Sequence, residues 1–560
     1  MFVFTPSQSK QPGAWQKFVF GLSFFHSVIQ ERKKFGPLGW NKTYEFNDSD
    51  LETSLTVLRM ALDEHEAIPW DALRFITGQI SYGGRVTDDW DRRCLMAILN
   101  KYYSPDILND EYRFSPSGTY FAPPSFTHSP AAAAAAAARA AAASVDGSVP
   151  AAAGAGPHAA TLSDYLDYIQ ALPAQDDPEV FGMHENANIA YLNQEGEAML
   201  STLLSMQPRD LESSSGRTSD DIVADLAQEI EAKLPALLDR REAGPTTFPA
   251  LDGDDGNGNG DDGTGAGNGD DDDDDDGFDP DNPSAAIEYD AEGAIIKRKK
   301  VVTDDMLAAS VDSMAEFLKQ EIDRFNRLLT TVKTSLVDLQ RAIKGQVVMS
   351  QDLDLMYGSL LNNKVPELWS RVAPPSLKHL AAWVVDLHLR IASVRDWLRN
   401  GKPASFWLSG FFFLQGFMTG VLQTHARRYR IPIDTIAFSY KVTTVRDPAE
   451  VRFPAEDGIY IHGLFTTGAS WSDDEQCLVD SPVGELISPL PVVHFLPREN
   501  YTRAESDYAC PVYKTAVRAG VLSTTGQSTN FVVDVHLPSK QDPTYWVLKG
   551  VAILCQPDSA

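Results

Sequence analysis

The densest group of charged side chains in the sequence falls within eight consecutive positions. Its members are Arg85, Asp88, Asp89, Asp91 and Arg92. Paired carboxylates of this kind can divide the acid and base roles of a catalytic site. The same pattern also suits the first turn of a helix, where an aspartate caps free backbone amides and acidic groups complement the helix dipole. We favour the capped helix, which would run through Cys94 to Tyr102.

Other reactive side chains are scattered along the sequence. His462 and His494 both fall in predicted strands and could face each other, and Cys510 precedes Pro511. A cysteine acts as a nucleophile only with a nearby base, and no spacing in the sequence indicates one. We therefore expect structural roles for these residues. A hydrolase that uses a histidine or cysteine site stays as an alternative hypothesis.

Motifs that bind phosphate or metal are absent from the sequence. Gly401-Lys402 is followed by proline and lacks the earlier glycine of a phosphate-binding loop. A calcium loop placed on the aspartate run 270–276 would have Asn282 and Pro283 where the glutamate ligand belongs. The four cysteines are far apart, which argues against a disulfide framework and a metal site. We predict no catalytic, ATP-binding or metal site and no cofactor in this chain.

Two further motifs could bind a ligand or serve the fold. Trp407 and the triplet Phe411-Phe412-Phe413 could line a pocket, but an anchor for the core at a helix entry is the simpler interpretation. The polar run 523–530 could bind an anion through backbone amides. A tight connection between two strands is the simpler interpretation of this run.

The amino-acid composition limits the classes of protein to which the chain can belong. Of the 560 residues, 43% are hydrophobic, which excludes a uniformly disordered chain. The net charge of −30 argues against a broad nucleic-acid-binding surface. Fourteen aspartates between 252 and 281 carry nearly half of that charge, and an alanine tract occupies 131–143. We predict two disordered inserts here, and no secretory signal or membrane span, and so expect a soluble intracellular protein.

Hydrophobic periodicity predicts an α+β protein. Leucines at 51, 55, 58 and 62 mark a helix that Ser49 and Glu52 would cap. Apolar residues at steps of three and four over 307–343 predict one helix of about 40 residues. This helix either forms a coiled-coil dimer or packs on helices of its own chain. We favour the second arrangement, because helical segments at 365–400 follow and need a partner.

The pattern changes to short β-type runs after residue 431. Such runs occupy 492–495, 531–537 and 545–554, with glycines and prolines between them. They predict an antiparallel sheet or an open barrel.

Several motifs, taken in order, resemble the C-terminal end of dynein heavy chains. The structural signature comprises Gly36, Pro37, Leu38, Gly39, Trp40, Gly83, Gly84, Asp88, Trp90, Asp91, Trp407, Gly410, Phe411, Phe412, Phe413, Tyr513, Lys514, Thr515, Ser523, Thr524, Thr525 and Gly526. The sequence motifs at 407–413, 422–427 and 431–434 are similar to the corresponding motifs of single-headed inner-arm axonemal heavy chains.

The resemblance implies a lid followed by a C-terminal domain, and the two inserts, which are not features of the family, divide the chain into six parts. These are an AAA+ lid-like helical domain (13–124), an Ala-rich insert (125–161), the helical start of the dynein C-terminal domain (162–242), an acidic disordered insert (243–300), the helical part of that domain (301–430) and its small antiparallel β-barrel (431–560). The lid would belong to the sixth AAA+ module of a motor ring.

The resemblance also implies a function without chemistry. The segment would brace and regulate the AAA+ ring of a minus-end-directed microtubule motor in ciliary or flagellar movement. ATP and magnesium would bind in modules absent from this chain. The expected partners are the remaining AAA+ modules and, through the full motor, light and intermediate chains and microtubules, with no nucleic acid or membrane. The expected location is the cytoplasm, the cytoskeleton and the axoneme of a cilium or flagellum.

Two expectations concern the chain as a whole. Residues 1–12 are unlike the family, so the sequence is expected to be a piece of a longer motor. The alternative function is a free-standing acidic scaffold that binds partners through the long helix and the acidic tract.

Overall fold

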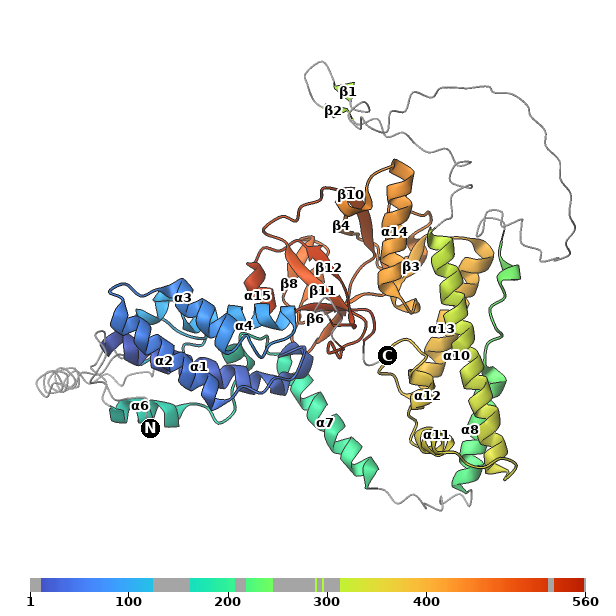
Figure 1. Ribbon diagram of the computed structural model, residues 1–560, viewed down its shortest axis with the longest axis horizontal. Coiled ribbons are helices and arrows are strands. Elements are labelled where there is room, and N and C mark those ends of the chain that lie inside the picture. The colour runs from blue at the N-terminus through green and yellow to red at the C-terminus, as the bar shows by residue number, and fades with distance from the viewer. Residues whose placement is uncertain are drawn as a thin grey trace, which may run out of the picture.

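The computed structural model describes residues 12–123, 162–206, 218–244, 288–289, 295–296, 313–521 and 528–557. A helical unit at one end, a central group of sheets and a second helical bundle at the other end follow one another in Figure 1. The predicted α+β class is confirmed. The Ala-rich insert and nearly all of the acidic insert lie outside the described residues.

The N-terminal unit is helical because apolar residues recur at helical spacing. Phe18, Leu22, Phe25 and Ile29 are all buried along the first helix. Its elements are α1 (Pro12–Glu31), η1 (Arg32–Leu38), α2 (Asp48–Glu64), α3 (Trp70–Phe75), η2 (Ile76–Ser81), α4 (Asp89–Tyr102) and η3 (Pro105–Leu108). Helix α1 packs against both α2 and α4, so this unit has its own helical core.

The predicted cap of α2 is wrong by two residues. The helix follows Asn47, and the carboxylate of Asp50 accepts a hydrogen bond from the Asn47 backbone amide at 2.9 Å. Ser49 therefore lies inside the first turn. The run holds several residues that can cap a helix, and spacing alone does not decide which of them adopts the extended backbone of a cap.

Seven further elements lie between this unit and the long helix of the second bundle among the described residues. They are α6 (Leu162–Ala171), η4 (Pro178–Phe181), α7 (Ala187–Ser205), α8 (Ser219–Lys233), η5 (Arg240–Glu242) and the paired two-residue strands β1 (Glu288–Tyr289) and β2 (Ile295–Ile296). Helix α7 contacts η1 and extends away from the sheets in Figure 1.

The long helix α10 (Ser313–Ile343) organises the second bundle. Its apolar stripe, including Leu318, Phe325, Val332 and Leu339, is buried. The partners are α8, α11 (Gln351–Leu361), α12 (Glu367–Ser370), α13 (Leu380–Asn400) and α14 (Leu414–Tyr429). The predicted packing on helices of the same chain is therefore confirmed, while residues 307–312 of the predicted helix lie outside the described part.

The β region consists of separate sheets. Four strands are ordered β3–β5–β10–β4, five are ordered β12–β11–β13–β6–β9, and β7 pairs with β8. The strands are β3 (Ser405–Trp407), β4 (Ile436–Val442), β5 (Ile459–His462), β6 (Phe465–Thr467), β7 (Ser470–Ser472), β8 (Cys477–Val479), β9 (Ile487–Pro489), β10 (Val493–Glu499), β11 (Tyr508–Tyr513), β12 (Phe531–Leu537) and β13 (Ala552–Leu554).

The predicted small antiparallel barrel is wrong in two respects. Among the described residues the sheets do not close on themselves, and two pairings are parallel: β3 with β5 and β11 with β13. Parallel neighbours require crossover connections, and a run of short apolar segments does not reveal which pairs will use them. Strand β3 also comes from a segment that was predicted to be helical.

The predicted β-type run at 545–554 is a helix followed by a strand. Helix α15 (Pro543–Leu548) begins where the Asp542 carboxylate accepts the amide of Thr544 at 2.7 Å. Proline in the first turn suits this start. Gly550, with φ +66°, separates α15 from β13. The cap and the glycine override the β preference of the residues between them.

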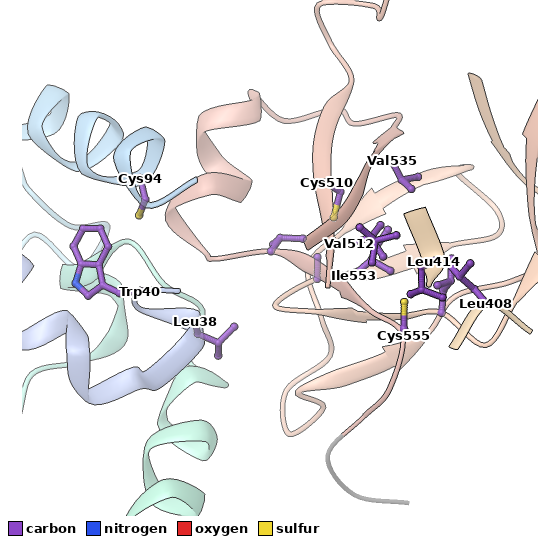
Figure 2. Packing of buried hydrophobic residues seen from close by; sticks show 14 of the residues in the cluster. Leu38, Trp40, Cys94, Leu408, Leu414, Cys510, Val512, Val535, Ile553 and Cys555 are labelled. Carbon is purple, nitrogen blue, oxygen red and sulfur yellow. The ribbon is translucent and has the colours of Figure 1, made fainter. Parts of the chain in front are cut away.

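One continuous hydrophobic core joins these parts. Its buried members come from α1 and α4, from α10 and α13, and from the sheets. Figure 2 shows Trp40 and Cys94 on the N-terminal side and Cys510, Val512 and Ile553 among the strands. Because both groups belong to one cluster, apolar packing extends from the N-terminal unit to the sheets.

Truncating a side chain in the buried stripe of α10 should lower the stability of the chain. Replacing the fully buried Leu336 by alanine should lower the free energy of unfolding by about 2–5 kcal/mol, because it removes packed methyl groups and leaves a cavity. Denaturant unfolding followed by circular dichroism measures this change. The exposed Lys333→Ala on the same helix is the control. Equal unfolding midpoints for the two variants would contradict the assigned helix face.

Candidate functional site

Most described signature residues gather where the N-terminal unit meets the five-stranded sheet. We call this contact the junction and define it by η1 with residues 39–41, the start of α4, strand β11, and residues 548–551. A second group, at 407–413, lies against α10. Neither group surrounds a reactive centre, so each is described by what it holds together.

Arg32 is the central residue of the junction. Its side chain is fully buried, and its guanidinium donates to three backbone carbonyl oxygens. Nε donates to Gly39 at 2.8 Å, Nη1 to Phe181 at 2.5 Å and Nη2 to Leu548 at 2.6 Å. One cation therefore joins three segments that lie far apart in the sequence. The sequence analysis did not identify Arg32 as a site residue.

The turn after Arg32 needs glycine for two reasons. Gly36 has φ +55°, a backbone conformation that other residues rarely adopt. A Cβ on Gly39 would lie 1.9 Å from the Arg32 carbonyl oxygen. Pro37 fixes the backbone between them, and Leu38 is buried against the sheet side (Figure 2).

Trp40 is buried on the other side of this turn. Its ring nitrogen donates to the carbonyl of Ile29 at 3.1 Å, which anchors the turn to the end of α1. Across the contact, Gly550 approaches the same turn, because a Cβ there would lie 2.3 Å from the carbonyl oxygen of Leu38. Glycine at position 550 thus allows the two backbone segments to touch.

Asp88 caps α4, which confirms the capped-helix interpretation. Its carboxylate accepts the amides of Trp90 at 3.0 Å and Asp91 at 3.1 Å. The side-chain amide of Asn41 donates to Asp88 at 3.2 Å and to the hydroxyl of Tyr513 at 2.8 Å. The cap therefore also links the N-terminal unit to β11.

Asp91 is buried and saturated with donors. It accepts the backbone amides of Asn41 at 2.8 Å and Lys42 at 3.1 Å, and the hydroxyl of Tyr44 at 2.8 Å. Burial, reinforced by the charge of Asp88, raises the pKa of Asp91 to about 7. A carboxyl whose oxygens are engaged in this way serves the fold better than proton transfer to a substrate.

The other members of the charged cluster form ion pairs. Arg85 pairs with Asp50 at 2.8 Å, and Arg92 lies 3.8 Å from the exposed Asp89. The carboxylates of Asp88, Asp89 and Asp91 are therefore engaged by the fold, which favours the capped helix over a paired-carboxylate site.

Trp90 and the signature glycines at 83 and 84 support the same helix. Arg93 lies over the Trp90 ring, 4.0 Å from its centroid, and donates to the hydroxyl of Tyr508 at 3.2 Å and the carbonyl of Ala509 at 3.3 Å. A Cβ on Gly83 would be 2.3 Å from the Gly78 carbonyl oxygen, and one on Gly84 would be 2.8 Å from that of Ile80. These glycines make the turn that leads into α4.

The aromatic group at 407–413 is built around a buried carboxylate. Glu321 of α10 accepts the backbone amides of Phe412 at 2.7 Å and Phe413 at 3.3 Å, and pairs with Arg324 at 2.6 Å. Burial raises the pKa of Glu321, and these donors oppose the shift. The segment that enters α14 is thus bound to the long helix by its backbone.

The side chains of this group behave mainly as a core anchor, as expected. Phe411 is buried, and Phe412 packs 4.6 Å from Phe325, whereas Phe413 is 45% exposed. Gly410 fits under the Trp407 ring, where a Cβ would be 3.0 Å from a ring carbon. Trp407 also lies below the buried guanidinium of Arg390.

The remaining signature residues that the structure describes lie at the end of β11. Lys514 donates its backbone amide to Asn530 at 3.0 Å, and the Thr515 hydroxyl accepts the side-chain amide of Asn530 at 3.0 Å. Ser523, Thr524, Thr525 and Gly526 lie outside the described residues. The predicted strand connection at 523–530 is therefore only partly described.

The residues considered for a hydrolase site do not meet. His462 bonds the hydroxyl of Ser405 at 2.8 Å, whereas His494 lies opposite Tyr460 in the sheet register. Cys510 is fully buried, and burial raises the pKa of its thiol. All four cysteines are buried and free. Within the described ranges, no group of three potential metal ligands is found, and no helix has the length and apolar character of a membrane span.

Comparison with known proteins assigns the chain to a family. Residues 193–555 match the family model of the C-terminal domain of the dynein heavy chain, and residues 15–142 match that of the AAA lid domain of the dynein heavy chain. The protein belongs to the dynein heavy-chain family. The junction of this dynein segment therefore lies between the lid and the C-terminal domain, and both matched regions contribute to it.

Curated relatives agree with this assignment. The dynein segment is 41% identical to human "Dynein axonemal heavy chain 6" and 38% identical to human "Dynein axonemal heavy chain 3" and "Dynein axonemal heavy chain 1". Each alignment covers 97% of this chain and 11% of the relative. The chain thus spans about a tenth of the length of these relatives.

The role of Arg32 predicts a large effect of its removal. Arg32→Met should lower the free energy of unfolding by at least about 3 kcal/mol, because it removes three charge-assisted hydrogen bonds and leaves buried carbonyl groups without donors. Denaturant unfolding of the full chain measures the change. The exposed neighbour Lys33, changed to Met, is the control. A loss no larger than that of the control would show that the junction does not depend on Arg32.

Burial of Asp91 predicts a pH dependence. Its pKa is about 7 in the folded chain against an ordinary value of 3.8, so the folded state holds a proton that the unfolded state releases. The free energy of unfolding should therefore fall as pH rises from about 4 to about 7, with a contribution from Asp91 approaching 1.4 kcal/mol per pH unit.

Substitution isolates this contribution. Asp91→Asn should flatten the pH profile of the unfolding free energy over that range, whereas Asp89→Asn, at an exposed position, should leave it unchanged. Unfolding midpoints measured at several pH values make the comparison. Parallel profiles for the wild type and Asp91→Asn would refute the raised pKa.

Proposed function

We propose that this chain is the non-catalytic C-terminal segment of a dynein heavy chain, and that it braces and regulates the AAA+ ring of a minus-end-directed microtubule motor. The junction is the observation that carries the proposal. It binds the lid to the C-terminal domain through one shared core and through buried hydrogen bonds from Arg32 and Asn41.

The mechanism follows from the stiffness of this contact. Packed interiors and hydrogen-bonded buried groups move as rigid bodies rather than deforming. A lid that turns with its ring module would therefore carry the C-terminal domain with it. The domain would then resist or transmit that rotation wherever it touches other modules.

The setting of the segment is part of the proposal. The relatives are named axonemal heavy chains, which supports a place in the axoneme of a cilium or flagellum, within the cytoskeleton. The preceding AAA+ modules would be the direct partners, and ATP and magnesium would bind there. Light chains, intermediate chains and microtubules would be reached through the whole motor, of the inner-arm type.

The scaffold alternative has weaker support. A scaffold that recruits partners through the long helix needs an apolar face free for them, but the stripe of α10 is buried by helices of this chain. The acidic tract, which would be the other binding element, lies outside the described residues. The motor segment therefore accounts better for the described fold.

A glycine substitution tests the bracing role in a complete motor that carries this segment. Gly550→Ala should disturb the junction, because the added Cβ would meet the Leu38 carbonyl oxygen at 2.3 Å. We expect microtubule gliding velocity to change at least about twofold while nucleotide affinity at the first AAA+ module stays the same. Gliding assays and nucleotide titration measure the two quantities.

The matched control separates the junction from backbone strain. Gly118 also has positive φ, at +75°, but has open space around it, so Gly118→Ala imposes strain without contact. The proposal predicts normal velocity for this control. Unchanged velocity in a folded Gly550→Ala motor would argue that the contact between lid and C-terminal domain does not regulate output.

A further inference from the structure

A small, partly open pocket lies at the junction. Its volume is about 30 Å³, and its walls include Arg32, Asn41 and Arg93 from the lid side and Tyr513 and Arg518 from the other. A cavity of this size holds a water molecule or a single small ion. It is too small for a phosphate group or an organic anion.

Three arginines, Arg32, Arg93 and Arg518, line this pocket. Arg32 and Arg93 donate to carbonyl and hydroxyl oxygens, which are neutral acceptors. Arg518 is only 4% exposed. In the described part of the chain, the Nε atoms of Arg93 and Arg518 find no acceptor. The Asp534 carboxylate is close enough to Arg93 for the two charges to interact.

The other groups in the walls do not balance this charge. Asp91 is the one carboxylate among the described lining residues, and its oxygens already accept three hydrogen bonds. Burial raises the pKa of Tyr508, of Tyr513 and of the Cys94 thiol, so these groups stay neutral. Buried charge without a counter-charge is costly, and unpaired donors add to that cost.

We propose that the cavity binds one monatomic anion, chloride under physiological conditions, between the guanidinium groups of Arg93 and Arg518. A halide fits the volume, places a negative charge between these arginines and accepts hydrogen bonds from several donors at once, including the unpaired Nε groups. Arg32 adds positive charge from the lid side. Because Arg93 belongs to the lid and Arg518 to the C-terminal domain, the ion fastens one to the other. The proposal does not depend on motor activity.

Anomalous diffraction tests the site directly. In crystals of the full chain grown with sodium bromide, an anomalous peak should lie in the cavity within hydrogen-bonding distance of the Arg93 and Arg518 side chains. Density without an anomalous signal would mean that water fills the cavity, which overturns the proposal. This measurement uses the wild-type chain and does not depend on the folding of any variant.

A solution experiment distinguishes specific binding from occupancy at crystal concentrations. Sodium chloride should stabilise the chain relative to sodium gluconate at equal ionic strength, with the unfolding equilibrium constant falling about tenfold when chloride exceeds its Kd tenfold. Arg518→Met should abolish the difference between the salts. Arg371→Met, at a position whose side chain is 65% exposed, should retain it. Equal salt responses in the wild type and Arg518→Met would refute the site.

Discussion

The desolvated guanidinium of Arg32 constrains the whole junction. A cation that is fully buried loses its water, and the fold must replace that water with oxygen atoms at fixed positions. Here the replacements are the carbonyl groups of Gly39, Phe181 and Leu548. The first requires a tight turn after η1, and the other two require that distant segments pack at that point. The lid and the C-terminal domain are therefore held in one relative position.

In the second helical bundle the buried charge is negative, so the fold must supply hydrogen-bond donors in place of water. Glu321 is buried on α10, and the backbone amides of Phe412 and Phe413 supply its donors. This contact fixes the entry to α14, and α14 packs against strands of both main sheets. The buried charges of Arg32 and Glu321 therefore each position separate elements through hydrogen bonds with backbone groups. At both of these contacts the buried ionisable group joins separate elements of the fold.

The sequence by itself determined the fold class, the main helices and the cap of α4. These follow from local chemistry: the apolar period of α10 is visible in the sequence, and Asp88 stands before a helical run whatever lies around it. The signature glycines were also visible, since tight turns and close backbone contacts need them. The resemblance carried by these motifs was sufficient to predict the family.

Only the tertiary structure decided which partners these residues have. The role of Arg32 could not be predicted from the sequence, because its acceptors at Phe181 and Leu548 lie 149 and 516 positions away. The strand order, with its two parallel pairings and open sheets, likewise depends on crossovers that short apolar runs do not encode. Whether the Arg518 side chain finds hydrogen-bond acceptors also depends on its neighbours in the folded chain. Local preferences fix the elements, whereas desolvation and pairing act between residues that meet only in the folded protein.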